Sequence, residues 1–312
     1  MQDCKVDVVI PVYKPQEQFL DLLERLRKQT VEINRIILIN TEKKYFDEEI
    51  FCISKNIEVI HIHKEEFDHA ATRDMGMNLS DADYVLFMTM DAMPADEKLI
   101  EKLLEGFEEE NVRVAVTYAR QLPSKTCRLQ EKYTRKFNYP KYDILKTRDK
   151  ISDMGIKTYF CSDVCAMYDR QIYAANGGFC EQAIFNEDMI YAAKVINSGF
   201  GVKYCSSAKV IHSHNYSCME QFRRNFDMGV SQAEHPEVFR DISSESEGRK
   251  LVIGTMKYLF KKGHWYEIPY LFVSSVFKLA GYKKGLKYRK MKPSAILKYT
   301  SNREYWKFET KN

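Results

Sequence analysis

The sequence lacks the glycine-rich loops that most often bind nucleotides in α/β proteins. No GxGxxG follows the first predicted strand, where Pro11, Val12, Tyr13 and Lys14 stand instead, and no Walker-type phosphate loop occurs. Those glycines let the backbone approach a pyrophosphate, so their absence argues against a dinucleotide-binding Rossmann protein and a P-loop nucleotidase. If this chain binds a nucleotide, another arrangement must hold the phosphates.

Paired cysteines and internal repeats are missing as well. The eight cysteines form no CxxC pair, which suits reduced thiols in a cytosol, so we expect small buried hydrophobes rather than disulfides or zinc ligands. The N-terminus enters a predicted strand at once, and we expect no secretory signal. With 312 residues, 45% of them hydrophobic and 29% charged, the chain can form one large α/β domain with an appendage or two domains.

The first 120 residues alternate strand-like and helix-like segments. Such alternation predicts a Rossmann-like α/β fold with a mostly parallel sheet and helices on both faces. The predicted strands are 6–13, 35–40, 57–62, 84–91 and 112–118, and the predicted helices are 16–28, 70–79 and 96–109. A second set follows, with a strand at 161–168, a turn at 176–178, a helix at 187–197 and short strands at 201–205 and 208–214. The basic, Tyr-rich residues 121–158 are expected to form an insertion or lid over the ligand edge of the sheet.

An apolar run at 84–94, YVLFMTMDAMP, contains a single carboxylate, Asp91. A buried parallel strand reads as a nearly unbroken apolar run, so Asp91 is expected at the carboxyl end of a strand, where open α/β sheets bind ligands. One acid there could hold a metal and a diphosphate. The alternative is that Asp91 only caps a turn.

Residues 67–76, FDHAATRDMG, directly follow a predicted strand. The small residues Ala70 and Ala71 would let backbone N–H groups approach an anion, and Arg73 adds a fork of donors that suits phosphate. The plainer alternative makes Asp68 an N-cap and Arg73 a surface ion-pair partner of a nearby acid.

Glu187 and Asp188 begin the predicted helix at 187–197. Acids in a first turn commonly complement the helix dipole, which is worth about 0.3–1 kcal/mol each. The glycine turn and the apolar residues before this pair could instead hold one carboxyl as a general base. Both interpretations stay open from the sequence.

Two further groups come later in the chain. His212 and His214 end a predicted strand, where a period of two puts both imidazoles on one face, able to bind a divalent metal or a phosphate. Arg223 and Arg224, on the aromatic helix that follows, could neutralise a leaving diphosphate or simply be solvated.

Taken together, five motifs resemble the inverting nucleotide-sugar glycosyltransferases of family 2, most closely their bacterial rhamnosyltransferase branch. They are VVIPVYK, FDHAATRDMG, TMDAMPAD, GGF followed by NED, and HSHNYSxxxQFRRxFDxG, in this order over about residues 5–235. The resemblance implies a GT-A fold, a nucleoside diphosphate sugar donor and a divalent cation, Mg2+ or Mn2+.

The resemblance also implies roles for single residues. Asp188 would be the catalytic base, with Asp163 and Glu187 as secondary or acceptor-site acids. Asp91 would be the metal carboxylate of a DxD-like site, and His212 or His214 a ligand to metal or diphosphate. The implied donor site consists of Pro11, Val12, Tyr13, Asn40, Thr41, Asp68, Arg73, Met90, Arg223 and Arg224.

The chemistry that this resemblance implies follows from charge. Asp188 takes the proton of an acceptor hydroxyl as the oxygen attacks the anomeric carbon, and the cation, Arg73 and Arg223 or Arg224 stabilise the departing diphosphate. No covalent enzyme intermediate is required.

The motifs depart from the family pattern in three places. Thr89 stands at the first position of the DxD-like site, which leaves Asp91 as the only carboxylate there and favours modest metal affinity. Met90 replaces a frequent Gln, and Ala70 and Ala71 replace a frequent Gly-Gly pair. These two departures bear on the identity of the sugar.

The C-terminal part differs from the rest in charge. Residues 249–312 carry 16 Lys or Arg against three acids, whereas the remainder carries 32 against 41. Residues 258–289 mix aromatic side chains with Lys and Arg clusters, and their longest uncharged stretch, Ile268–Phe277, is too short to span a bilayer. We expect this segment to lie on an anionic membrane surface. The alternatives are a helical cap packed on the catalytic domain and binding to nucleic acid.

We therefore predict a cytoplasmic enzyme, peripheral on the inner face of the cell membrane. It would move L-rhamnose from dTDP-rhamnose onto a lipid-linked surface polysaccharide, such as an O-antigen or capsule precursor, and would not bind nucleic acid. Alternatives are a UDP-galactose or UDP-glucose donor, and a catalytically silent module that binds sugar nucleotides or membranes. The expected domains are a transferase domain at 1–235, with a nucleotide-binding half at 1–120, the insertion at 121–158 and a catalytic half at 159–235, and a helical extension at 236–312.

Overall fold

The computed structural model describes residues 4–240 and 245–306 of the chain. It divides into two compact units. The first is made of Met1–Ser124, Tyr139–Gln182 and Glu187–His212, and the second of Lys125–Asn138, Ala183–Asn186 and Ser213–Asn312. The second unit includes residues on both sides of position 235. A domain boundary near residue 235 therefore stays a prediction about parts that fold separately.

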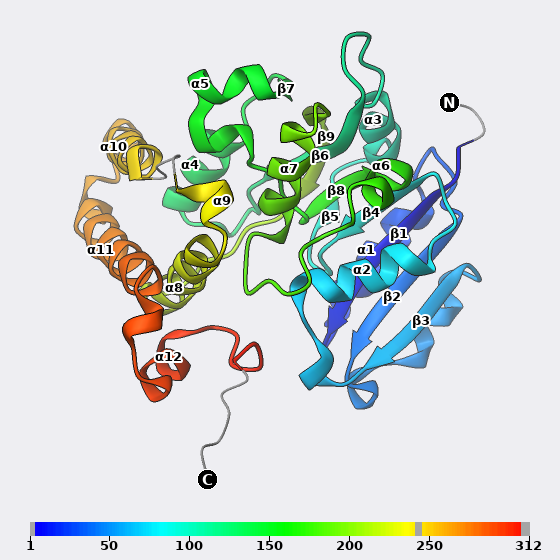
Figure 1. Ribbon diagram of the computed structural model, residues 1–312, viewed down its shortest axis with the longest axis horizontal. Coiled ribbons are helices and arrows are strands. Elements are labelled where there is room, and N and C mark those ends of the chain that lie inside the picture. Colours follow the sequence, from blue (N-terminus) through cyan, green and yellow to red (C-terminus); the bar gives the residue numbers. More distant parts are fainter. Residues whose placement is uncertain (1–3, 241–244, 307–312) are drawn as a thin grey trace. The chain divides into compact units, whose positions relative to one another are not determined.

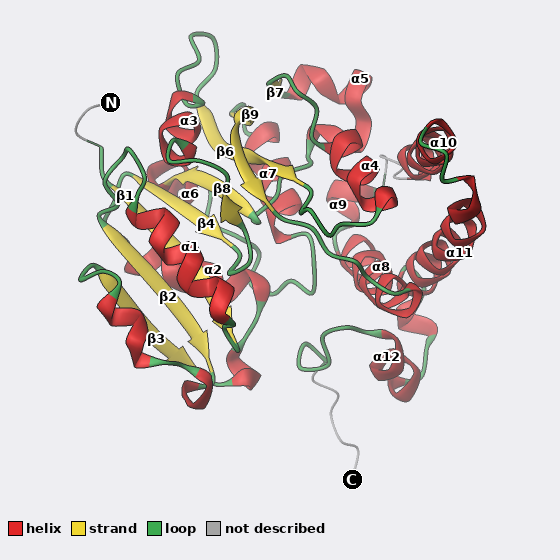
Figure 2. Cartoon of the chain, turned by 180° about the vertical axis from the view of Figure 1, so that it is seen from behind, coloured by secondary structure: helices red, strands yellow, loops and turns green. Residues whose placement is uncertain are grey.

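In the part of the chain that is described, the first unit is built on a nine-stranded sheet (Figures 1 and 2). The strands are β1 (Val6–Tyr13), β2 (Arg35–Thr41), β3 (Ile57–Ile62), β4 (Tyr84–Met88), β5 (Met93–Pro94), β6 (Val114–Leu122), β7 (Ile144–Lys146), β8 (Cys165–Asp169) and β9 (Gly201–Ile211). Their order is β3-β2-β1-β4-β8-β6-β9-β5, and β7 pairs with β9. Strands β1 to β4 run parallel, as do β6 and β9, whereas β8 is antiparallel to both neighbours. The predicted mostly parallel sheet is confirmed.

Helices cover both faces of this sheet, as predicted. On one face, α1 (Glu17–Arg27) and α3 (Leu99–Glu105) pack against the even-numbered residues of β1, because the apolar positions of α1 recur at helical spacing. On the other face lie α2 (His69–Leu79), α6 (Arg170–Ala175) and α7 (Glu187–Asn197). Gly76 of α2 sits directly against Val9 of β1, where any Cβ would collide with the valine side chain. Close contact of helix and strand therefore requires glycine there. A short helix, α5 (Ile151–Met154), lies in the segment between β7 and β8.

Several predicted boundaries are corrected by the structure. Strand β4 ends at Met88, and residues 89–92 form a turn in which the Ala92 N–H donates to the Thr89 carbonyl. The predicted strands at 201–205 and 208–214 are one strand, β9, with a register shift opposite Ala119 and Arg120. Since β9 ends at Ile211, its two-residue period does not extend over both histidines. The expected insertion is not one lid, because β7 returns to the sheet.

The second unit is helical. Its helices are α4 (Leu129–Asn138), α8 (Cys218–Glu234), α9 (Pro236–Phe239), α10 (Glu245–Lys261), α11 (Ile268–Gly285) and α12 (Pro293–Tyr299). Helices α8 and α11 pack closely because Gly229, Gly281 and Gly285 leave no Cβ between the two backbones. The buried carboxylate of Asp227 on α8 accepts hydrogen bonds from the segment that follows α12. No helix among the described residues combines the length and the apolar character needed to cross a bilayer.

The cysteines only partly match the sequence-based prediction. Cys127, Cys161, Cys165 and Cys205 are buried, as expected of small hydrophobes, and all eight are free thiols. Cys52 is exposed, contrary to the prediction.

Candidate active site

The carboxyl end of β1 presents an exposed aromatic side chain. Tyr13 is 37% exposed and meets the ring of Tyr45 edge-on at 5.8 Å between centroids. Lys14 adopts a left-handed backbone conformation with φ of +51°, which is unusual for a residue other than glycine, and its ammonium lies 4.7 Å from the Tyr45 ring. Val12 is buried in the core, and Pro11 is partly buried, so Tyr13 is the side chain that the end of this strand offers to a ligand.

The end of β2 carries buried polar groups. Asn40 and Thr41 are buried, and the Asn40 amide nitrogen lies 3.0 Å from Nδ1 of His61. Among the described residues, neither Asn40 Oδ1 nor Thr41 Oγ1 finds a hydrogen-bond partner. An unpaired buried polar atom costs about 1–3 kcal/mol, so such atoms are typical of places that a ligand or water completes.

Asp91 and His212 meet at the same edge of the sheet. The turn after β4 holds Asp91 half-buried, and the N–H of His212 continues the sheet pairing by donating to the Leu122 carbonyl at 2.9 Å. Nε2 of His212 lies 3.5 Å from a carboxylate oxygen of Asp91. Two residues before Asp91 in the chain, the hydroxyl of Thr89 is buried without a hydrogen-bond partner in the described part of the protein. The predicted Asp91–His212 pairing therefore exists within one unit.

Gln121 at the end of β6 supports this pair. Its Oε1 lies 3.1 Å from Nδ1 of His212, and its Nε2 donates to the Ser162 hydroxyl at 2.9 Å. Gln121 is buried. The sequence reasoning missed this residue, although its position three residues after the predicted strand 112–118 placed it at the ligand edge.

Arg73 is the centre of a second, acidic cluster. Its guanidinium is buried, lying 3.0 Å from Glu187 and 3.3 Å from Asp163, and it donates to the His69 carbonyl at 2.8 Å. Burial lowers the pKa of Arg73, but the attraction of Glu187 and Asp163 outweighs it and the pKa is raised. The alternative of a surface ion pair for Arg73 is wrong.

Asp188 is fixed by backbone donors. Its two carboxylate oxygens accept N–H groups from Met189 at 2.7 Å and Asp163 at 3.2 Å. Burial, followed by repulsion from Glu187 and Asp163, raises the pKa of Asp188 well above its usual range. A carboxylate with raised proton affinity and partial exposure suits a general base.

Asp163 lies just before β8, which runs antiparallel and so begins at the ligand edge. Burial raises the pKa of Asp163 to about 7, although Arg73 opposes the shift, and the hydroxyl of Tyr168 donates to it at 2.6 Å. Because Ser162 is hydrogen-bonded to Gln121, a contiguous chain of contacts joins His212 to the acidic cluster.

Asp68 behaves as the plainer alternative proposed. Its carboxylate caps α2 by accepting the N–H groups of Ala70 at 2.8 Å and Ala71 at 3.0 Å. The prediction that these two N–H groups are offered to an anion is therefore wrong in this structure, because Asp68 already takes them.

Comparison with known proteins identifies the family. The profile described as Glycosyl transferase family 2 matches residues 7–177. The O-antigen chain rhamnosyltransferase RfbN of Salmonella typhimurium is 34% identical over 306 residues, which are 97% of this chain and 96% of RfbN. This chain belongs to glycosyltransferase family 2. The O-antigen chain rhamnosyltransferase WbaN of Salmonella anatum is 31% identical over 302 residues, 96% of this chain and 95% of WbaN.

Solved structures confirm the GT-A fold of this family 2 transferase. The mannosyltransferase PcManGT from Pyrobaculum calidifontis, solved with GDP-Man and Mn2+, matches with a TM-score of 0.56 at 12% identity. The match covers 94% of this chain and 78% of PcManGT. TarS 1-349 of S. aureus matches with a TM-score of 0.52 at 13% identity and covers 92% and 91% of the two chains.

The remaining predicted residues of the transferase lie elsewhere. Met90 is partly buried in the turn after β4 and packs against the core of the first unit. His214, Arg223 and Arg224 belong to the second unit, where the His214 ring stacks on Tyr216. Their roles in donor or metal binding stay predictions.

Proposed function

We propose that this protein is a metal-dependent inverting glycosyltransferase that moves L-rhamnose from dTDP-rhamnose onto a lipid-linked O-antigen or capsule precursor. The observation that carries the proposal is the setting of Asp188, a backbone-fixed carboxylate whose pKa is raised by burial and by Glu187 and Asp163. The names of RfbN and WbaN support rhamnose as the sugar and an O-antigen chain as the acceptor.

The residues at the Asp91 turn fit a divalent cation. Carboxylate oxygen and imidazole nitrogen are both ligands of Mn2+, and a histidine ligand usually donates its other ring N–H to a fixed oxygen, as His212 does to Gln121. The buried, unpartnered hydroxyl of Thr89 belongs to the same turn as Asp91. His214 follows His212 by two residues and is a candidate additional ligand. When bound, Mg2+ or Mn2+ would supply positive charge for the departing diphosphate.

The chain's own residues would divide the remaining work. Asp188 accepts the proton of the acceptor hydroxyl as that oxygen attacks the anomeric carbon, and no covalent intermediate forms. The positive charge of Arg73 offsets the repulsion among the three neighbouring carboxylates, and its two ion pairs hold Glu187 and Asp163 in place. Tyr13, with Asn40 and Thr41, would receive the nucleoside at the ends of β1 and β2.

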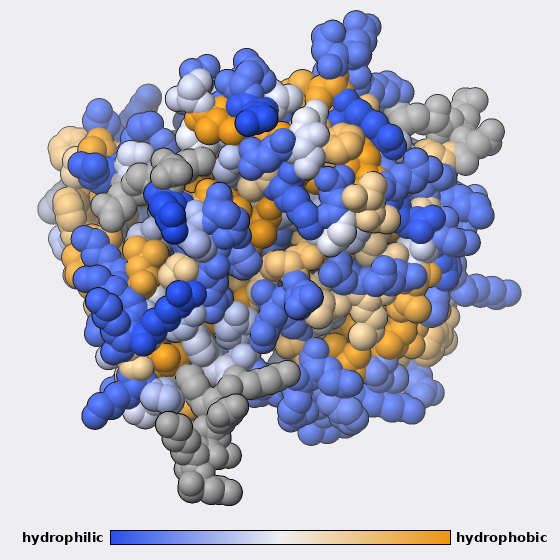
Figure 3. Space-filling view, viewed as in Figure 1, coloured by the Kyte–Doolittle hydropathy of each residue, from blue (hydrophilic) through white to orange (hydrophobic). Residues whose placement is uncertain are grey.

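A membrane surface would bring the acceptor to this site. Apolar side chains that are at least 47% exposed gather on α10, on the 3-10 turn Trp265–Glu267 and on α11, and Figure 3 shows apolar groups at the surface there. We name them the apolar face: Ile253, Phe260, Trp265, Tyr266, Phe272, Val273, Val276 and Leu279. The exposed Lys257, Lys261 and Lys262 lie among them in sequence. Apolar side chains with interspersed lysines are typical of a helix that lies on an anionic leaflet, which supports a peripheral position on the inner membrane.

The test is the substitution Asp188→Asn. We expect rhamnosyl transfer to fall by about 100-fold or more, because the base is lost, while dTDP binding stays within about two-fold. Asp91→Ala should instead weaken donor binding in the presence of Mn2+. Near-normal turnover by the Asp188→Asn variant would remove Asp188 from the base role.

A second measurement tests the donor sugar. Nucleotide release from UDP-glucose or UDP-galactose but not from dTDP-rhamnose would show that dTDP-rhamnose is not the donor. Transfer from none of these donors would favour the catalytically silent module.

A further inference from the structure

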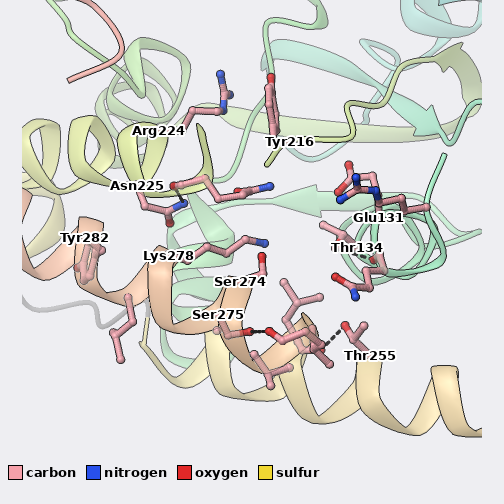
Figure 4. Close-up of a pocket in the computed structure, with 18 of the residues that line it drawn as sticks. Glu131, Thr134, Tyr216, Arg224, Asn225, Thr255, Ser274, Ser275, Lys278 and Tyr282 are labelled. Carbon is pink, nitrogen blue, oxygen red and sulfur yellow. Dashed lines mark hydrogen bonds between the residues drawn. The ribbon is translucent and has the colours of Figure 1, made fainter. Parts of the chain in front are cut away.

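The second unit contains a cavity of about 800 Å3, whose lining includes His214 and Arg224 from the last of the five motifs. Its walls come from α4, α8, α10 and α11, and Figure 4 shows side chains of these helices converging on it. All of its lining residues belong to the second unit. A cavity of this size is within the range of sites for small molecules.

One part of the cavity wall is cationic. Arg128, Arg224, Arg249 and Lys278 line it, against the single acid Glu131 among the described lining residues. Glu131 is already paired with Arg135 at 2.6 Å, so its charge is compensated. The wall therefore carries an excess of positive charge that suits an anion.

Lys278 is the cation best placed for a ligand. It extends from α11 into the cavity, with Ser274 and Ser275 on the same helix beside it (Figure 4). Lys278 is partly buried, and within residues 4–240 and 245–306 its ammonium makes no hydrogen bond or ion pair. Burial lowers the pKa of Lys278, which means that its charge is poorly solvated there. An anionic group beside it would restore the lost solvation.

Another part of the wall is apolar and reaches the surface of the second unit. Met228, Leu251, Val252 and Leu271 line the interior, and Ile253 and Leu279 line the cavity while also belonging to the apolar face. An apolar chain could thus pass from a membrane surface into the cavity without crossing water. The combination matches a ligand with an anionic head and a long apolar tail.

We propose that this cavity binds the anionic lipid end of the acceptor, with its phosphate group at Lys278 and the first carbons of its apolar tail against the apolar part of the wall. The inference rests on the proposed function, of which it specifies the acceptor site. Chain connectivity supports it, because Phe185 of the cavity wall precedes Asp188 by three residues and His214 follows His212 by two. Whatever the arrangement of the two units, the Cα atoms of Phe185 and Asp188 are at most about 11 Å apart.

The experiment measures binding of farnesyl diphosphate, below its micelle concentration, to the full-length protein by calorimetry without any donor. Inorganic diphosphate and farnesol serve as the head-only and tail-only probes. Lys278→Met keeps the length of the side chain but removes the charge, and the matched control is Lys283→Met, an exposed lysine on α11 outside this cavity. We expect farnesyl diphosphate to bind at least about ten-fold more tightly than either partial probe, and Lys278→Met to weaken it about ten-fold. Lys283→Met should change it less than about two-fold.

Two results would overturn the inference. If Lys278→Met and Lys283→Met weaken farnesyl diphosphate binding equally, the protein attracts the anion through its overall charge rather than through Lys278. If inorganic diphosphate and farnesyl diphosphate bind with equal affinity, the apolar part of the wall does not contribute to binding. Because no donor is present, the outcome is separate from that of the proposed function. If the protein transfers rhamnose but Lys278→Met does not change lipid binding, only the proposal for the cavity fails. If farnesyl diphosphate binds as expected but no sugar is transferred, only the proposed enzymatic function fails.

Discussion

Oε1 of Gln121 lies 3.1 Å from Nδ1 of His212. A carboxamide oxygen only accepts hydrogen bonds, so Nδ1 carries a proton, and in the neutral imidazole Nε2 then keeps its lone pair. That lone pair faces a carboxylate oxygen of Asp91 at 3.5 Å. Two acceptors at this distance attract each other only when a cation or a proton lies between them. The tautomer fixed by Gln121 thus prepares His212 as a metal ligand.

The first prediction concerns this support. Gln121→Leu keeps the approximate size of the side chain but removes the acceptor for Nδ1, so His212 is no longer held in one tautomer and orientation. We expect Mn2+ affinity to fall by about ten-fold or more, measured by titration of the protein with Mn2+.

The matched control retains the acceptor. Gln121→Glu still offers an oxygen to Nδ1, and the Ser162 hydroxyl can donate to its other oxygen. Mn2+ affinity should then be at least that of the unmodified protein. Equal weakening by the two substitutions would show that Gln121 merely packs the end of β6.

The second prediction is a pH profile. A general base must be ionised, so transfer should decline as pH falls through the raised pKa of Asp188, at a higher pH than an ordinary carboxyl would give. Glu187→Gln removes a neighbouring negative charge that contributes to this raised pKa. Asp188 then loses its proton more readily, and the acid limb of kcat/KM for rhamnosyl transfer should move to lower pH.

Glu181 provides the control for that measurement. It is an exposed acid six residues earlier in the chain, and it is not among the groups that shift the pKa of Asp188. Glu181→Gln makes the same change in net charge and should leave the profile in place. If the acid limb of kcat/KM lies at the same pH in Glu187→Gln as in the unmodified protein, or at a higher pH, the electrostatic coupling between Glu187 and Asp188 is contradicted.

The sequence predicts those parts of the site that depend on the pattern of neighbouring residues. The apolar run before Asp91 indicated a strand that delivers an acid to the ligand edge, and the structure places Asp91 in the turn directly after β4. The first-turn acids Glu187 and Asp188 were found because α7 begins where the sequence predicted it. Both inferences need only residues that are neighbours in the chain.

Contacts between distant segments could not be predicted in the same way. Arg73 on α2 finds its partners before β8 and at the start of α7, and no local pattern tells a buried cluster from a surface ion pair. The antiparallel direction of β8 was equally hidden, yet it is what brings Asp163 to the ligand edge. The strand expected to extend to His214 ends at Ile211, which the sequence does not show.

The last prediction tests the apolar face. Phe260 is 71% exposed at the end of α10, so replacing it by Asp leaves the packing of the second unit intact. Inserting a phenylalanine into a bilayer surface is worth about 1.5–3 kcal/mol, so Phe260→Asp should weaken binding to phosphatidylglycerol vesicles by about ten-fold or more in a sedimentation assay. Tyr142 is a similar exposed aromatic residue, at 67%, in the first unit. Tyr142→Asp adds the same charge to the protein, so equal losses in the two variants would mean that vesicles respond to net charge rather than to this face.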